Sequence, residues 1–153
     1  MLNYHPAKTT LEQRGQIRIL IDTRTNDGAR SAFGGPYPSL CLYALRTFID
    51  ENPVAMQRMT NALVAALRYL HRQTSADLID VIAPKYKLGE RGFAIKMIDR
   101  SRQLFSRDGK FDPNALMTPL RIMSAFDDKI AAAGIDVSRT YTNRFVDAVP
   151  PSP

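Results

Sequence analysis

Apolar residues recur at the spacing of a helix through much of the chain, most clearly after Asn52. Asn52 is a favourable N-cap, and Pro53 stands at the first helical position, where a missing N–H removes no hydrogen bond. The pattern predicts a long amphipathic helix that ends near Arg72. Its apolar face comprises Met56, Met59, Leu63, Leu67 and Leu70.

Two shorter helices are expected next. The first begins at Thr74 or Ser75 and ends before Pro84, because proline cannot continue a helix. The second runs over about residues 91–106, where apolar residues again recur at intervals of three and four.

A further helix is marked at both ends. Asp112 and Pro113 repeat the pairing of an N-cap with a first-position proline, and Gly134 is a typical C-terminal stop. Pro119 lies inside this helix, so we expect it to kink the helix there or to restart it with Thr118 as a new cap.

The first 50 residues show a different pattern. Residues 17–21 and 39–45 are short apolar runs typical of strands, the first of them rich in β-branched residues. Residues 24–38 carry several Gly and Pro and few periodic apolar positions, which predicts a long loop. Residues 46–50 are compatible with a helical turn.

These elements predict an α/β fold that is rich in helices and has two or so strands. Two strands do not make a stable sheet by themselves, so the pattern resembles the end of a larger α/β protein. We expect one domain over residues 1–153, with a strand and long-loop region (1–46), a helical region (47–149) and a proline-rich tail (150–153).

Composition and charge narrow the functional classes. The chain has 153 residues, 44% hydrophobic and 24% charged, which is typical of a folded globular protein. The net charge of +6 favours acidic partners or an anionic ligand. The basic residues form no run of five or six, and Trp is absent, so nucleic-acid binding is not expected.

Few residues suggest catalysis or metal binding. His5 and His71 have no spacing typical of a metal site, and His71 is expected to compensate the dipole at a helix end. The single Cys41 lies in an apolar segment, where a buried structural role is expected. Gly34-Gly35 lacks the Lys-Ser of a phosphate loop, and Asp108-Gly109 lacks the spaced carboxylates of a calcium loop. We therefore expect no catalytic residue, metal or cofactor, and not an enzyme.

Five short motifs follow one another in a recognisable order. They are Glu-Gln-Arg-Gly at residues 12–15, Phe-Ile-Asp-Glu-Asn-Pro at 48–53, Ser-Arg-Asp-Gly at 106–109, Gly134, and Tyr-Thr-Asn-Arg-Phe at 141–145. In this order the chain resembles the C-terminal part of periplasmic solute-binding proteins that serve ABC importers of nitrate, sulfonates, taurine and thiamine pyrimidines.

The resemblance implies a two-lobed type II periplasmic-binding-protein fold, of which this chain supplies the C-terminal portion. Such proteins close on a small ligand between their lobes and deliver it to an ABC transporter permease. The implied ligand is a small anionic or nitrogen- or sulfur-containing solute. Apolar faces that full-length relatives bury would be covered here by self-association.

The resemblance also suggests ligand contacts. Asn3, Tyr4 and His5 stand where the family places a loop that faces the cleft, and Tyr37 and Ser39 end the long loop. Ordinary loop and turn roles are the alternative for each of them.

The sequence does not decide where in the cell the protein acts, and it leaves two alternatives to the solute-binding function. No stretch approaches the roughly 20 apolar residues of a membrane span. The protein is expected in the periplasm as part of a longer secreted chain, and in the cytoplasm if Met1 is the true start.

One alternative function is an enzyme of thiamine-pyrimidine biosynthesis, which shares the family's fold. The other is a helical interaction module that recruits an acidic partner.

Overall fold

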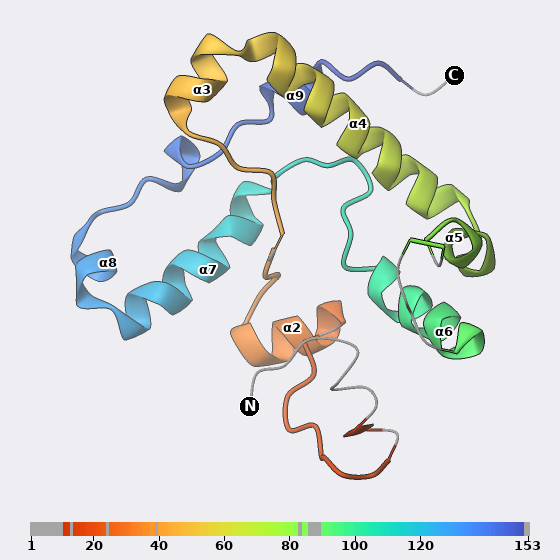
Figure 1. Ribbon diagram of the computed structural model, residues 1–153. Coiled ribbons are helices and arrows are strands. Elements are labelled where there is room, and N and C mark those ends of the chain that lie inside the picture. The colour runs from red at the N-terminus through yellow and green to blue at the C-terminus, as the bar shows by residue number, and fades with distance from the viewer. Residues whose placement is uncertain are drawn as a thin grey trace.

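The computed structural model (Figure 1) describes residues 11–12, 14–23, 25–38, 40–82, 84–85 and 90–151. Within these ranges the chain forms eight complete α-helices and one 3-10 helix, and it contains no strand. The prediction of an α/β fold with two or so strands, as the C-terminal portion of a two-lobed type II periplasmic-binding-protein fold, is therefore wrong, and the fold of the described residues is helical.

The two segments expected to be strands are irregular in the structure. Residues 17–21 and 40–45 belong to no helix or strand. Their apolar side chains largely face solvent, with Leu20 80% and Tyr43 88% exposed. A strand requires a neighbouring strand to accept and donate its backbone hydrogen bonds, and the described residues supply none. The apolar pattern specified a preference for extended backbone but not a pairing partner.

The segment expected to be a long loop contains helix α2, Asn26–Phe33. Thr25 is its N-cap, and the Thr25 hydroxyl accepts a hydrogen bond from the Gly28 N–H at 3.0 Å. Only Ala29 is buried, so the helix lacks the apolar periodicity that would have revealed it. Its caps, rather than a hydrophobic stripe, define its ends.

The central helix α4, Pro53–Arg72, confirms the clearest sequence prediction and follows the short helix α3, Arg46–Glu51. Asn52 separates the two helices, but its side chain does not cap α4 and instead donates to the Phe48 carbonyl at 3.1 Å. Figure 1 shows α9, Arg144–Asp147, beside the N-terminal half of α4.

Helices α5, Ser75–Ile82, and α6, Arg91–Arg102, pack together beyond the end of α4. Helix α5 agrees with its prediction, whereas α6 ends four residues before the expected residue 106. The small core between them consists of Leu78, Ile79, Ala94 and Ile98, with Leu70, Ile82 and Ile95 packed against it.

The expected single helix after Asp112 is divided into α7, Pro113–Phe126, and α8, Asp128–Ala132. The division falls at Asp127, whose carboxylate caps α8 by accepting from the Lys129 N–H at 2.9 Å. Helix α7 continues through Pro119 and does not restart at Thr118, so of the two expected outcomes the restart was wrong. A proline removes only one intrahelical hydrogen bond, which the packing of the remaining turns can offset.

No single core unites these helices. The 3-10 helix, Val137–Arg139, contacts α7, while α4 with α9 and α5 with α6 form separate clusters. Among the described residues no large side chain is more than 98% buried, and the small Ala94, 1% exposed, is the most deeply buried apolar residue. The chain exposes 11530 Å², whereas a compact monomer of 17.2 kDa exposes about 7,800 Å². Much apolar surface is therefore uncovered.

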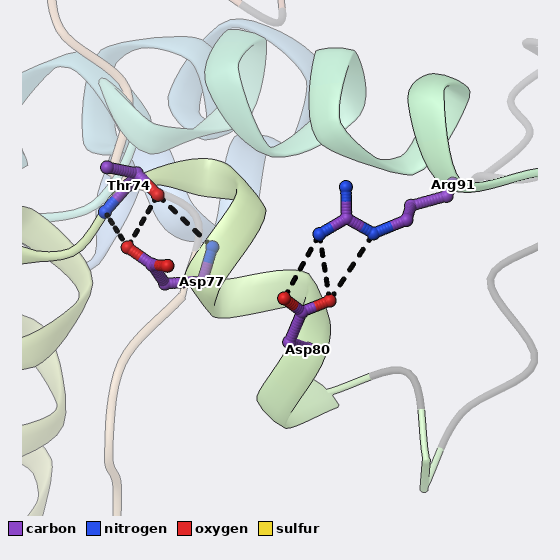
Figure 2. A network of polar contacts seen from close by, with 4 residues as sticks. All are labelled: Thr74, Asp77, Asp80 and Arg91. Carbon is purple, nitrogen blue, oxygen red and sulfur yellow. Dashed lines mark hydrogen bonds and ion pairs between the residues drawn. The ribbon is translucent and has the colours of Figure 1, made fainter.

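Polar contacts fix the start of α5 and tie it to α6 (Figure 2). The Thr74 hydroxyl donates to the Asp77 carboxylate at 2.6 Å and accepts from the Asp77 N–H at 3.1 Å, which is a reciprocal cap. The Arg91 guanidinium holds both carboxylate oxygens of Asp80, at 2.9 and 3.0 Å. Both pairs are exposed, so they position the helices more than they stabilise them.

The half-buried Arg102 joins three elements. Its guanidinium donates to the Leu70 carbonyl at 2.9 Å, to the Gln73 carbonyl at 2.7 Å and to the Ser75 hydroxyl at 2.9 Å. These acceptors belong to the end of α4, the linking residues and the start of α5. Arg102 thereby holds α6 at the C-terminal end of α4.

The Arg102→Ala variant should lose about 2 kcal/mol of unfolding free energy, because charge-assisted hydrogen bonds to carbonyls at a helix end are removed. Urea unfolding followed by circular dichroism at 222 nm measures this. Arg100→Ala, at an exposed position of the same helix, is the control and should change stability by less than about 0.5 kcal/mol. Equal losses in the two variants would refute the joining role.

Glu90 caps the start of α6. Its two carboxylate oxygens accept hydrogen bonds from the Gly92 N–H at 2.7 Å and the Phe93 N–H at 2.9 Å. These backbone hydrogen bonds lower the pKa of Glu90 below 4.5, and the nearby charge of Lys96 lowers it further. The ionised carboxylate is therefore part of the folded helix.

Because the folded-state pKa of Glu90 is lowered, its contribution is fully present above the unfolded-state pKa. It is lost as the pH falls from 4.5 through the lower folded value. We expect Glu90→Gln to flatten the dependence of stability on pH below 4.5, measured by urea unfolding at a series of pH values. Glu90→Asp keeps a capping carboxylate and should retain the dependence. An unchanged slope in Glu90→Gln would argue against the cap.

Candidate functional site

Tyr37 is the one predicted ligand contact that lies in the described part of the chain. It is half-buried, and its ring lies 4.6 Å from the Phe33 ring, with a tilt of 38° between the planes. Phe33 ends α2, so the stacking fixes the segment that leaves this helix. Asn3, Tyr4, His5 and Ser39 lie outside the described residues.

Two glycines turn the chain between Phe33 and Tyr37. Gly34 adopts a left-handed conformation, with φ 71°, and its N–H donates to the Arg30 carbonyl at 2.7 Å. Gly35 passes so close to α7 that a Cβ atom there would lie 2.5 Å from the hydroxyl oxygen of the buried Thr118. The two glycines thus serve a helix end and a close helix contact, not a phosphate loop.

Arg121 of α7 completes this site. Its Nη2 donates to the Phe33 carbonyl at 2.5 Å, and its side chain lies beside Gly34. We call this region the α2–α7 junction; it comprises Phe33, Gly34, Gly35, Tyr37, Thr118 and Arg121.

The α2–α7 junction places a phenol and a guanidinium against the same residue, Phe33. A guanidinium offers five N–H donors in a planar fork that matches carboxylates and other planar oxyanions. The contact with Phe33 also holds the otherwise exposed Arg121 in one place. Chemically, the guanidinium and the phenol can each donate hydrogen bonds to an anion.

Sequence reasoning missed Arg121 and Thr118. An arginine on the polar face of a helix is indistinguishable in sequence from a solvated surface residue. Thr118 was interpreted as a helix cap next to Pro119, whereas it is buried in α7 facing Gly35. The Gly34-Gly35 pair was the available signal, because adjacent glycines also mark a close approach of backbone to another element.

Other polar side chains have structural partners. His71 lies in the last turn of α4, as expected, and its Nε2 is 3.2 Å from the Phe105 carbonyl and 3.1 Å from that of Ser106. Because carbonyls only accept, Nε2 must carry a proton. Cys41 is exposed, so the expectation of a buried cysteine was wrong. Among the described residues, no three His, Cys, Asp or Glu side chains are grouped to hold a metal ion.

The two residues that follow the motif at 106–109 bind the C-terminal segment, which contains the motif at 141–145. Asn143 accepts from the Phe111 N–H at 2.9 Å and donates to the Phe111 carbonyl at 3.0 Å. Lys110 forms an ion pair with Asp147 at 2.7 Å, which raises the pKa of Lys110. The turn after residue 106 is therefore bound to the C-terminal segment.

The same turn and segment also contact α4. Gly109 has a φ of 82° and lies close to Val64. Phe145 is buried, and Gln57 donates to its carbonyl at 2.8 Å across 88 residues of sequence. Arg144 lies 3.6 Å from Asp50, within the motif that opens α4. Three of the five motifs thus converge on α4.

An apolar groove of 560 Å³ lies between α4 and α5. Arg72 is the charged residue among those that line the groove, and Val81, which also lines it, is 56% exposed. The groove is open to solvent and is lined by Ala65, Ala66, Tyr69, Leu70, Arg72, Leu78, Val81 and Ile82.

Comparisons with known proteins identify a structural relative. No protein-family model and no curated protein matches the chain. The solved structure of a protein from Bordetella bronchiseptica RB50 is similar, with a TM-score of 0.85 and 31% sequence identity. The match covers 94% of this chain and 45% of that one, so the chain spans less than half the length of this relative. No helix in the described residues is long and apolar enough to cross a membrane.

The Gly35→Ala variant should destabilise the protein by about 1–3 kcal/mol, because the added methyl group meets the Thr118 hydroxyl. Urea unfolding measures the loss. In a Thr118→Ala background the same change should be smaller by about 1 kcal/mol, since the clashing oxygen is gone. Additive effects in this cycle would show that α2 and α7 do not touch at this point.

Proposed function

We propose that this chain is the C-terminal portion of a solute-binding component of an ABC importer, and that it takes part in binding a small anionic or nitrogen- or sulfur-containing solute. The convergence of three motifs on α4 carries the proposal. Residues 48–53, 106–109 and 141–145 are far apart in sequence, yet side chains in or beside them bind one another. Motifs that build one structural unit are better evidence of shared ancestry than isolated similarities.

The large exposed surface of this chain favours the view that the chain is one portion of a protein and that further polypeptide covers part of it. The chain exposes about 3,700 Å² more than a compact monomer of its mass. The match to less than half of a longer relative is in keeping with this arrangement. In this role the partner is a permease and the compartment is the periplasm.

The α2–α7 junction is the proposed ligand contact within this portion. Arg121 supplies the positive charge for an anion, and Tyr37 supplies a hydroxyl and an aromatic face. The net charge of +6 assists the approach of anions over a longer range.

A helical interaction module is the second candidate. The exposed apolar side chains of α4 favour it, because apolar helix faces commonly bind partner proteins. Binding of a protein partner in the absence of any small-molecule ligand would support this candidate over the first.

A thermal-shift screen tests the proposal. Nitrate, taurine, an alkanesulfonate and a thiamine pyrimidine are the probes, and one of them should raise the melting temperature of the protein. Arg121→Ala should weaken binding of that probe at least tenfold, measured by calorimetry, because the charge-assisted hydrogen bonds are lost.

Arg139→Ala is the matched control, because Arg139 is exposed at the end of the 3-10 helix and far in sequence from α2. It should bind the probe like the unmodified protein. If no probe binds, or if both arginine variants lose binding equally, the proposed function or its site is refuted.

A further inference from the structure

Helix α4 has two apolar faces, and the described chain covers one of them. Met56 and Val64 are 5% and 3% exposed on the face that meets α9. On another face Met59 and Tyr69 are 46% and 40% exposed, and Leu63, which is 48% exposed, lies between the two faces. We call this second surface the exposed α4 face; it comprises Ala55, Met59, Ala62, Ala66 and Tyr69. Figure 1 places α4 at the outer edge of the molecule.

The residues of the exposed α4 face are spaced like those through which two helices pair in a coiled coil. Ala55, Met59, Ala62, Ala66 and Tyr69 follow one another at alternating steps of four and three residues. This repeat keeps one stripe of a helix facing a partner helix over several turns. A helix of 20 residues presents such a stripe over about 30 Å.

We propose that the exposed α4 face binds the same face of a second copy of this chain, with the two α4 helices antiparallel and crossing at Ala62. Two-fold symmetry about Ala62 places Ala55 opposite Tyr69, and Met59 opposite Ala65, one residue before Ala66. Each large side chain then meets a small one, and Ala62 lets the helix axes approach closely.

The groove between α4 and α5 fits this arrangement. It lies at the C-terminal end of the exposed α4 face, where Tyr69 and Leu70 line it. Antiparallel pairing brings the N-terminal end of the second α4 to this point. Val54 is 64% exposed there and is an apolar side chain of suitable size to enter the groove.

Charge complementarity selects the antiparallel orientation. Arg72 lies at the end of α4 and Glu51 just before its start, and both are exposed. In the antiparallel pair Arg72 of each copy lies near Glu51 of the other, which gives two opposite-charge contacts. A parallel pair would place Arg72 against Arg72 and Glu51 against Glu51, and like charges repel.

The uncovered surface of the whole chain exceeds what a standard pair buries. A standard interface removes about 800 Å² from each partner. The chain exposes about 3,700 Å² more than a compact monomer, so pairing accounts for part of this excess. The inference goes beyond the proposed function, because pairing through α4 requires no solute and no permease.

Sedimentation equilibrium of the 153-residue chain tests the pairing. We expect a dimer, and we expect Ala62→Glu to give a monomer, because the substitution places two carboxylates at the symmetry axis. Glu is a good helix former, and an unchanged circular dichroism spectrum confirms folding. Met123→Glu, at a 49% exposed position of α7, is the control and should remain dimeric.

Cross-linking tests the orientation. In a Cys41→Ser background, a short bismaleimide should link two copies of Ala62→Cys but not two copies of Ala55→Cys, whose sites lie about 21 Å apart in the antiparallel pair. Arg72→Glu should weaken the dimer at least tenfold, and adding Glu51→Arg should restore it.

Three results would overturn the inference. They are a monomeric or polydisperse unmodified chain, a dimer that survives Ala62→Glu, and equal cross-linking at both positions. None of them bears on solute binding, which the thermal-shift screen measures separately.

Discussion

The burial of one face of α4 under Phe145 is the contact on which the rest of the described chain depends. It joins the middle of the sequence to the C-terminal segment, and the Gln57 hydrogen bond to the Phe145 carbonyl fixes its register. Asn143 then holds the turn before α7, and Arg102 attaches α6 to the far end of α4. Without this contact the α5–α6 cluster and the C-terminal helices would not be held to the same helix.

The sequence predicted the central and C-terminal helices well because their signals are local. Asn52-Pro53 and Asp112-Pro113 mark helix starts through the proline's fixed φ and missing N–H. The fold class failed because a strand depends on a partner elsewhere, and residues 17–21 have no neighbouring strand in the described chain. Helix α2 was missed because its caps, and not its apolar residues, define it.

The candidate site was only partly predictable for the same reason. Tyr37 was singled out by its place at the end of the expected long loop, but its neighbours Thr118 and Arg121 come from a helix more than 80 residues later. Contacts between distant elements are set by tertiary packing, and no local spacing encodes them. The glycine pair is compatible with the close approach of another element but does not identify that element.

The 88 residues between Gln57 and Phe145 also constrain how the protein is made. Chains are synthesised from the N-terminus, so α4 emerges from the ribosome long before the segment that covers it. Until Phe145 follows, both apolar faces of α4 are exposed to solvent, and contacts of such long sequence separation form slowly. The nascent chain is therefore a substrate for chaperones during this interval, and premature termination before residue 145 would leave an aggregation-prone product.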